Sequence, residues 1–537
     1  MTDTRTSGRQ EEATGGARRP TPFWANSGLW LAVLMAVQLI SYSRMLSGTL
    51  LFNEFNRDDT ETYVSLGHSI ANGRGYTDSL DSSEPVPHRR VTPGFPLLLA
   101  GAFLPTDSVM PAQIMIILFS LANALLLFWL ARQFLPGFAS LTCVALTVCS
   151  PIYDQFSTVL MTEQPLTFFF LLSALSLYLW TIRGCRLDRW FAMAIFSLGF
   201  GMLVKPTIGV LIPAWLLWLC FGAASRSSLQ RRLGMASILV TIALTPTIWW
   251  SVHLSHVPAQ GPLGTTQVED LLTAGRQGGA SLRWVDLARI ASNNVMWFVP
   301  KRLLDALGGS GWFSEKAFSV ILPAWLKLCF VGTAVIGLGW ALLNFRKLGF
   351  IALAVSFLCL LLPFHYQGGN PRYWLVVHPL MLIILLAGLS RLFYVVCGPH
   401  RGLRILGPAL LTSACLGALC ILVLDHIWRE PQRGQVWRAL ADMAQQAGTI
   451  TPENAVIVSH NSNYVRFVSH RFSSLKKEDV EALDGRRAPA RPVYVILPTE
   501  QAFAEHHRTV ETLPGHPVEA ARNQYYTLFR LCVQGRD

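Results

Sequence analysis

Long apolar runs that recur along the chain are the feature that most constrains its fold. About eleven are present, several close to the ~20 residues that a helix needs to cross a bilayer. Only 14% of the residues are charged, whereas soluble domains average about 25%, so much of the surface cannot face water. The sequence therefore predicts an all-α polytopic membrane protein. The predicted spans are 28–50, 109–131, 137–153, 164–182, 190–204, 207–224, 233–252, 318–343, 348–364, 372–394 and 404–424.

Two long polar segments interrupt the predicted membrane domain, which extends over 28–425. The first, 51–108, contains acids, a Gly-rich turn and basic residues, and its Pro-containing run at 93–105 is expected to be partly buried without crossing. The second, 253–317, is either a lid over a site or packing material. Residues 1–27 contain no apolar run and predict a disordered cytoplasmic tail.

The composition changes after Asp425. A helical pattern near 434–447 is followed by short apolar runs typical of β-strands, separated by charged, Pro-containing connections. We therefore expect residues 426–537 to form a small extracytoplasmic α/β domain. The strand-like runs are 455–458, 493–497 and 525–531.

Basic residues concentrate in short loops on one side of the predicted membrane domain. With the N-terminus inside and each span crossing, these loops are cytoplasmic, which is the distribution that orients membrane proteins. The net charge of +12 therefore does not indicate nucleic acid, and no basic stripe with interleaved aromatic residues is present. The loop residues are Arg132, Arg183, Arg186, Arg189, Arg226, Arg231, Arg232, Arg346, Lys347, Arg401 and Arg404.

The same topology brings the conspicuous charges near membrane depth to the opposite, extracytoplasmic face. Such residues are costly in a membrane and few are expected in a structural bundle, so their convergence predicts a functional site. They come from several separate segments of the chain. The residues are Asp58, Asp59, Arg89, Arg90, Asp154, Glu163, Lys205, His365, Arg372 and Tyr373.

Each of these residues also has a structural interpretation. Asp58 or Asp59 suits the N-cap of the helix that follows, which is expected to lie along the membrane interface. Asp154 and Glu163 flank a short turn and are equally consistent with structural pairing. Lys205 either snorkels or holds an anionic ligand, and the arginines suit a lipid headgroup as well as a phosphate.

Five motifs occur in order along the chain: Y..L...I.NGRGY, R.TPGFPLLLA, VLMTEQPLTFFFLLSALSLYLW, GMLVKPTIGVLIPAWLL and NPRYWLVVHPLMLIILLAGL. This order resembles the GT-C glycosyltransferases, and most closely the bacterial relatives of protein O-mannosyltransferases and of the lipid A aminoarabinose transferase. The resemblance covers about residues 50–215 and 365–395. The chain departs from it in having Asp-Asp where Asp-Glu is common, and Lys205 where Arg is frequent.

The resemblance implies a multi-pass protein of the bacterial cell membrane that acts at its extracytoplasmic face. The implied reaction transfers a sugar from a polyprenyl-phosphate donor to a lipid, glycan or protein acceptor. An inverting transfer of this kind needs a general base for the acceptor hydroxyl and positive charge near the departing phosphate. The groove between spans would hold the prenyl tail among membrane lipids.

The resemblance also implies roles for the candidate residues. Asp58 or Asp59 is the base, with Asp58 preferred, and Asp154 and Glu163 are secondary acids. Some GT-C enzymes use a divalent cation, so Mg²⁺ or Mn²⁺ is a candidate cofactor with Asp58, Asp154 and Glu163 as candidate ligands. The remaining candidates are Arg89, Arg90, Lys205 and Arg372 for the donor phosphate and His88, His365 and Tyr373 for substrate contacts.

Two other functional classes fit a polytopic membrane protein. A transporter or flippase for a lipid-linked or anionic solute often has repeated halves with helices broken at the midplane, and the sequence shows no such duplication. A scaffold that binds a partner through its C-terminal domain would scatter its charges over both faces of the membrane. The convergence of charges on one face favours an enzyme.

Overall fold

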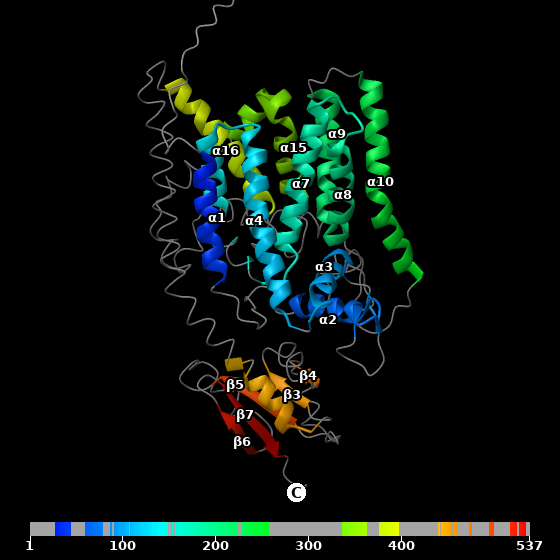
Figure 1. The fold of residues 1–537 in the computed structure, drawn as a ribbon, viewed down its shortest axis with the longest axis vertical. Coiled ribbons are helices and arrows are strands. Elements are labelled where there is room, and N and C mark those ends of the chain that lie inside the picture. Colours follow the sequence, from blue (N-terminus) through cyan, green and yellow to red (C-terminus); the bar gives the residue numbers. More distant parts are fainter. Residues whose placement is uncertain are drawn as a thin grey trace, which may run out of the picture.

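The computed structural model shows a bundle of α-helices with a small β-sheet beyond one end (Figure 1). Almost all of the predicted tail 1–27, most of the loop 253–317 and the predicted span 404–424 lie outside the residues that the structure describes. The described residues are 27–43, 59–78, 86–88, 91–106, 108–148, 150, 153, 156–157, 159–222, 228–256, 336–361, 375–396, 439–440, 442–452, 456–459, 472–474, 493–498, 516–522 and 526–532.

The helices of the bundle run side by side along its length (Figure 1). Three of them, α4, α7 and α10, are long and apolar enough to cross a membrane, and shorter apolar helices accompany them. They lie at predicted spans, and the total of about eleven spans stays a prediction. The bundle helices are α1 (Ser27–Ser43), α4 (Met110–Arg132), α5 (Gly137–Val148), α7 (Glu163–Ile182), α8 (Arg189–Val204), α9 (Leu211–Phe221), α10 (Leu229–His256), α15 (Phe345–Leu361) and α16 (Val377–Val396).

The first long loop folds into two short helices with a small hairpin between them. Helix α2 (Asp59–Ala71) lies across one end of the bundle, close to α3 (Gly94–Phe103) (Figure 1). Between them, β1 (Thr77–Asp78) pairs antiparallel with β2 (Val86–Pro87). With 10 residues, α3 is about 15 Å long and cannot cross a bilayer, as expected for the run at 93–105.

Close packing joins α2 to α3. A Cβ on Gly67 would lie 2.8 Å from Leu99 Cβ, so the missing side chain lets the two helices approach each other. The next residue of α2 is His68, and its ring stacks on the Phe103 ring with the centroids 3.9 Å apart. The two helices of the first loop therefore form one unit, which connects the beginning of the loop to its end.

Helices α7 and α8 form a closely packed antiparallel pair. A Cβ on Gly201 of α8 would lie 2.9 Å from Phe169 Cβ of α7, so glycine is needed for this approach. Ser173 Oγ donates a hydrogen bond to Ser197 Oγ at 3.0 Å across the same interface. Small residues and hydroxyl groups commonly join membrane helices in this way. Because the two helices are antiparallel, the first residue of α7 lies near the last residue of α8.

A buried polar network fixes the segment that precedes α7. The Gln164 side-chain amide donates to the Tyr153 carbonyl and to Ser157 Oγ, each at 3.2 Å. Asn123 Nδ2 donates to Gln164 Oε1 at 2.8 Å, and the Tyr153 hydroxyl donates to the Ser120 carbonyl at 2.9 Å. The first turn of α7 is therefore held by α4 and by the chain that enters it.

Replacing Asn123 by Leu is expected to lower the free energy of unfolding by about 1–3 kcal/mol, because it leaves Gln164 Oε1 buried without this donor. Chemical denaturation of the detergent-solubilised protein measures the change. Gln133→Leu is the matched control, since its side chain donates to the Trp129 carbonyl on the exposed surface, where water can replace the bond. Equal losses in the two variants would contradict a stabilising role for the network.

The C-terminal part of the chain contains a five-stranded sheet in the order β4-β3-β5-β7-β6. Strand β3 pairs parallel with β4 and β5, whereas β7 pairs antiparallel with β5 and β6. The sheet lies beyond the end of the bundle at which α2 and α3 are found (Figure 1). That residues 426–537 form an independent extracytoplasmic domain stays a prediction. The strands are β3 (Val456–Ser459), β4 (Phe472–Ser474), β5 (Val493–Pro498), β6 (His516–Arg522) and β7 (Tyr526–Cys532).

Candidate functional site

Two ionisable residues lie where the start of α7 meets the end of α8. Glu163 is the first residue of α7, and Lys205 directly follows the last residue of α8. A negative charge at a helix N-terminus and a positive charge at a C-terminus are both favoured by the helix dipole. Pro206 begins the short 3₁₀ helix η2 (Pro206–Val210), so α8 ends at this point. The local sequence thus places both charges at one end of the bundle.

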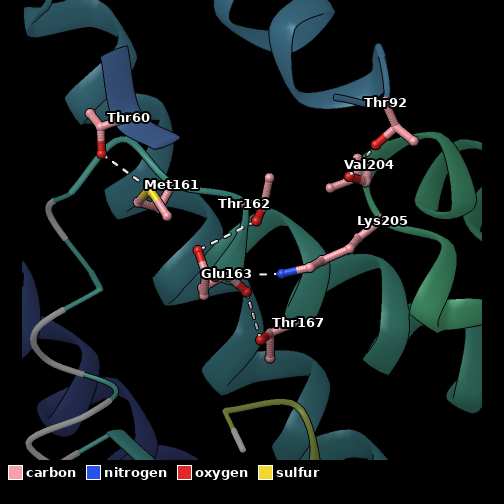
Figure 2. Close-up of polar contacts among 8 residues, drawn as sticks. All are labelled: Thr60, Thr92, Met161, Thr162, Glu163, Thr167, Val204 and Lys205. Atoms are coloured by element: carbon pink, nitrogen blue, oxygen red, sulfur yellow. Dashed lines mark hydrogen bonds and ion pairs between the residues drawn. The ribbon is translucent and has the colours of Figure 1, made fainter. Parts of the chain in front are cut away.

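Glu163 and Lys205 form an ion pair in which the carboxylate is buried and the lysine is partly buried (Figure 2). Lys205 Nζ lies 3.7 Å from Glu163 Oε1, and the two side chains are 16% and 1% exposed. Thr162 Oγ1 donates to Glu163 Oε2 over 3.4 Å. Both contacts are long compared with charge-assisted hydrogen bonds to a carboxylate, and Oε1 accepts no hydrogen bond from the described residues. Glu163 therefore keeps the capacity to accept a further hydrogen bond.

The start of α2 lies beside the start of α7. Thr60 Oγ1 donates to Met161 Sδ at 3.1 Å, and both residues are buried (Figure 2). Thr60 directly follows Asp59, the first residue of α2, and Met161 lies two residues before Glu163. This contact places the first turn of α2, which begins at Asp59, close to the residues that form the ion pair.

The end of the first loop contacts the end of α8. Thr92 Oγ1 donates to the Val204 carbonyl at 3.0 Å, one residue before Lys205 (Figure 2). A Cβ on Gly94 would lie 2.5 Å from both the Leu203 carbonyl carbon and the Val204 nitrogen, so the two backbones touch here. Two parts of the first loop are thus attached near the ion pair, one to the chain that enters α7 and the other to the end of α8.

Tyr76 holds the stretch that leads to Thr92. Its carbonyl accepts from the His88 N–H at 3.1 Å, and its hydroxyl donates to the Val91 carbonyl at 2.7 Å. Its ring also meets Trp250 of α10 edge-on, with the centroids 4.9 Å apart. Burial, reinforced by the nearby Tyr63, raises the pKa of the Tyr76 phenol well above its usual range. The hydroxyl therefore stays protonated and remains a donor at neutral pH.

The structure brings together two of the predicted site residues, Glu163 and Lys205. Asp59 is placed at the first position of α2. His88 is buried and meets the Tyr76 ring edge-on, with the centroids 6.0 Å apart. The predicted residues that lie outside the described part of the chain are Asp58, Arg89, Arg90, Asp154, His365, Arg372 and Tyr373.

A metal site stays a prediction. Among the described residues, no three His, Cys, Asp or Glu side chains lie close enough together to hold a metal ion. Of the three candidate ligands, Asp58 and Asp154 are outside those residues, and Glu163 is paired with Lys205.

Several residues that shape the site were not predicted as site residues. Thr60, Thr92, Gly94 and Thr162 are uncharged. The first three contact distant segments of the chain, and Thr162 contacts the side chain of the adjacent Glu163. The TPGFP motif of the first loop, which contains Thr92 and Gly94, was the one sequence signal that could have identified two of them.

The part of the chain that builds this site matches a known protein family. Residues 91–250 match the family described as dolichyl-phosphate-mannose-protein mannosyltransferase. That range includes Thr92, Gly94, Glu163 and Lys205. Comparison with curated protein sequences gives no match.

Solved structures share the fold over almost the whole chain. ArnT from Cupriavidus metallidurans, bound to undecaprenyl phosphate, is 13% identical with a TM-score of 0.59, covering 95% of this chain and 100% of that chain. Its apo form is 12% identical with a TM-score of 0.57, covering 94% and 98%. The Archaeoglobus fulgidus oligosaccharyltransferase, in complex with Zn and sulfate, is 12% identical with a TM-score of 0.52, covering 91% and 72%.

At these identities the structural likeness shows the fold, and the family match adds the sequence relationship. Both agree with the relationship predicted from the ordered motifs. The chain therefore has the fold of ArnT, and over residues 91–250 it is similar to the dolichyl-phosphate-mannose-protein mannosyltransferases.

Proposed function

We propose that the protein transfers a sugar from a polyprenyl-phosphate donor to a lipid, glycan or protein acceptor at the extracytoplasmic face of the membrane. The observation that carries this proposal is the Glu163–Lys205 ion pair, with its buried carboxylate, beside the start of α2. It supplies a cation for a phosphate and a carboxylate with spare acceptor capacity at one end of the bundle. The ArnT structure with bound undecaprenyl phosphate supports a polyprenyl-phosphate donor.

The proposed reaction is an inverting displacement at the anomeric carbon of the sugar. The acceptor hydroxyl attacks this carbon, the bond to the phosphate oxygen breaks, and the polyprenyl phosphate leaves with the bonding electrons. Lys205 stabilises the negative charge that develops on the leaving phosphate. Asp58 or Asp59 takes the proton of the hydroxyl, and Glu163 orients Lys205 and accepts a hydrogen bond from the acceptor. We also assign Arg89, Arg90 and Arg372 to the phosphate.

Basic residues at the far end of the bundle support the proposed orientation. Arg183 and Arg189 lie at the turn between α7 and α8, 5.3 and 5.1 Å from the centroid of the Trp190 ring. At the turn between α4 and α5, Arg132 lies beside Gly137. Both turns lie at the end of the bundle opposite to the Glu163–Lys205 ion pair. By the positive-inside rule, the basic end is cytoplasmic and the site is extracytoplasmic.

Transfer is tested with purified protein in liposomes that contain polyprenyl-phosphate sugars labelled in the sugar, mannose first, and an extract of membrane lipids and envelope proteins as acceptors. We expect the label to move from the donor to an extract component, with one equivalent of polyprenyl phosphate released. Liposomes without acceptor provide the control, in which the donor is expected to stay on its original side. Movement of intact donor across the bilayer without transfer would instead support the flippase alternative.

A further inference from the structure

We propose that Thr92 and Gly94 are positioning residues that place Lys205 for the donor phosphate. The inference rests on the proposed function, in which Lys205 acts on that phosphate. Thr92 lies 112 residues before Val204 in the sequence, and its contact crosses from the first loop to the end of α8. The first loop thus contributes to the site through an uncharged side chain.

The Thr92 hydroxyl acts as a cap supplied by another part of the chain. The last carbonyl groups of a helix have no donor within the helix and need one from elsewhere. Val204 is the last residue of α8 and is only 1% exposed, so water has little access to it. Thr92 Oγ1 donates to this carbonyl at 3.0 Å. Because the Val204 carbonyl belongs to the peptide group that begins Lys205, this bond fixes the orientation of the Lys205 backbone.

Gly94 holds the same peptide region from a second side. A Cβ at this position would lie 2.5 Å from the Leu203 carbonyl carbon and from the Val204 nitrogen, which is closer than non-bonded atoms approach. Both of these atoms belong to the backbone, so no side chain can rotate away to make room. The start of α3 therefore contacts the last turn of α8 at a distance that only glycine allows.

These two contacts complete the set that locates Lys205. Its N–H donates to the Gly201 carbonyl at 2.8 Å, and its ammonium group lies 3.7 Å from Glu163 Oε1. The N–H bond joins Lys205 to α8, and the ion pair joins it to α7. Thr92 and Gly94 add contacts from the first loop. The Lys205 ammonium group therefore keeps a fixed position relative to α2 and α3. A reacting group misplaced by about 1 Å can lose a large part of its rate.

The chain offers matched controls for both residues. Thr92→Val removes the hydroxyl at nearly constant volume, and Thr92→Ser restores it. Thr245→Val is its control, because Thr245 Oγ1 also donates to a backbone carbonyl, that of Thr241 at 2.8 Å, on the exposed face of α10. Gly94→Ala is compared with Gly101→Ala in the same helix, where an added Cβ meets nothing within 4 Å.

The test measures binding of polyprenyl phosphate, the KM for the lipid-linked donor, and the melting temperature of each purified full-length variant. We expect Thr92→Val and Gly94→Ala to raise both the Kd for polyprenyl phosphate and the donor KM by about tenfold. Thr92→Ser is expected to regain most of this affinity. Thr245→Val and Gly101→Ala should match the wild type. Thr92→Val should retain a melting temperature close to that of Thr245→Val.

A double-mutant cycle separates positioning from a general structural role. If Thr92 acts through Lys205, then Thr92→Val should cause no further loss of polyprenyl phosphate binding in a Lys205→Ala background. A full additional loss there would overturn the inference, as would wild-type binding by Thr92→Val in the native background. The proposed function has a separate criterion, since it fails if the wild type binds polyprenyl phosphate but transfers no sugar.

Discussion

Lys205→Ala is expected to lower kcat/KM for the lipid-linked donor by about 10²–10³-fold, because the leaving phosphate loses a preorganised positive charge in a site largely closed to water. Lys205→Arg keeps the charge and should retain more activity than the alanine variant. Lys347→Ala is the control, since this lysine is exposed near the start of α15 and belongs to the opposite, basic end of the bundle. Sugar transfer from a defined donor measures all three.

The same substitution also has a cost for stability that must be separated from its effect on the reaction. Lys205→Ala leaves the carboxylate of Glu163 buried without its counter-charge, and breaking a buried pair costs about 3 kcal/mol. The double variant Glu163→Gln with Lys205→Met removes both charges, so it is expected to recover stability but not activity. Chemical denaturation and transfer are measured on the same preparations. Recovery of transfer together with stability would contradict a role for Lys205 in the reaction.

The sequence predicted the ion pair only as two separate candidates. Glu163 and Lys205 were recognisable because a charge beside a long apolar run is costly and needs a reason. Their pairing was not predictable, because it depends on how closely α7 and α8 approach each other at Gly201. Snorkelling of Lys205 and structural pairing of Glu163 were therefore equally good interpretations until the two helix ends were placed together.

Uncharged residues were harder to find for a different reason. The value of the Thr92 hydroxyl comes from the Val204 carbonyl, and Gly94 matters because of the Leu203 and Val204 backbone. Neither of these contacts produces a recognisable sequence pattern near residue 92. The strands β4 and β6 were missed in a similar way, since FSS is very short and HPVEAAR lacks a continuous apolar run. Helices α4 and α7, by contrast, were predicted within one residue because their length and hydropathy are local properties.

Replacing both first-loop acids, Asp58→Asn with Asp59→Asn, is expected to lower kcat by about 10²–10⁴-fold, the usual contribution of a general base. The structural reason for choosing these acids is the contact between Thr60 and Met161, which keeps the start of α2 beside Glu163. Asn is isosteric with Asp, so helix α2 should still form. Binding of polyprenyl phosphate should be unchanged, because these residues are assigned to the acceptor hydroxyl and not to the phosphate.

The single variants and the pH dependence identify which acid acts. We expect Asp58→Asn to account for most of the loss, and the fall of kcat/KM at acid pH, where the base is protonated, to disappear in that variant. Glu61→Gln is the control, because it removes a negative charge from the first turn of α2 and leaves Asp58 and Asp59 unchanged. A similar loss of kcat in Glu61→Gln would show that the acids act only through their combined negative charge and that neither aspartate is a specific base. Wild-type rates in the double variant would exclude both aspartates as the base and leave Glu163, with its spare acceptor capacity, as the candidate base among the residues that the structure describes.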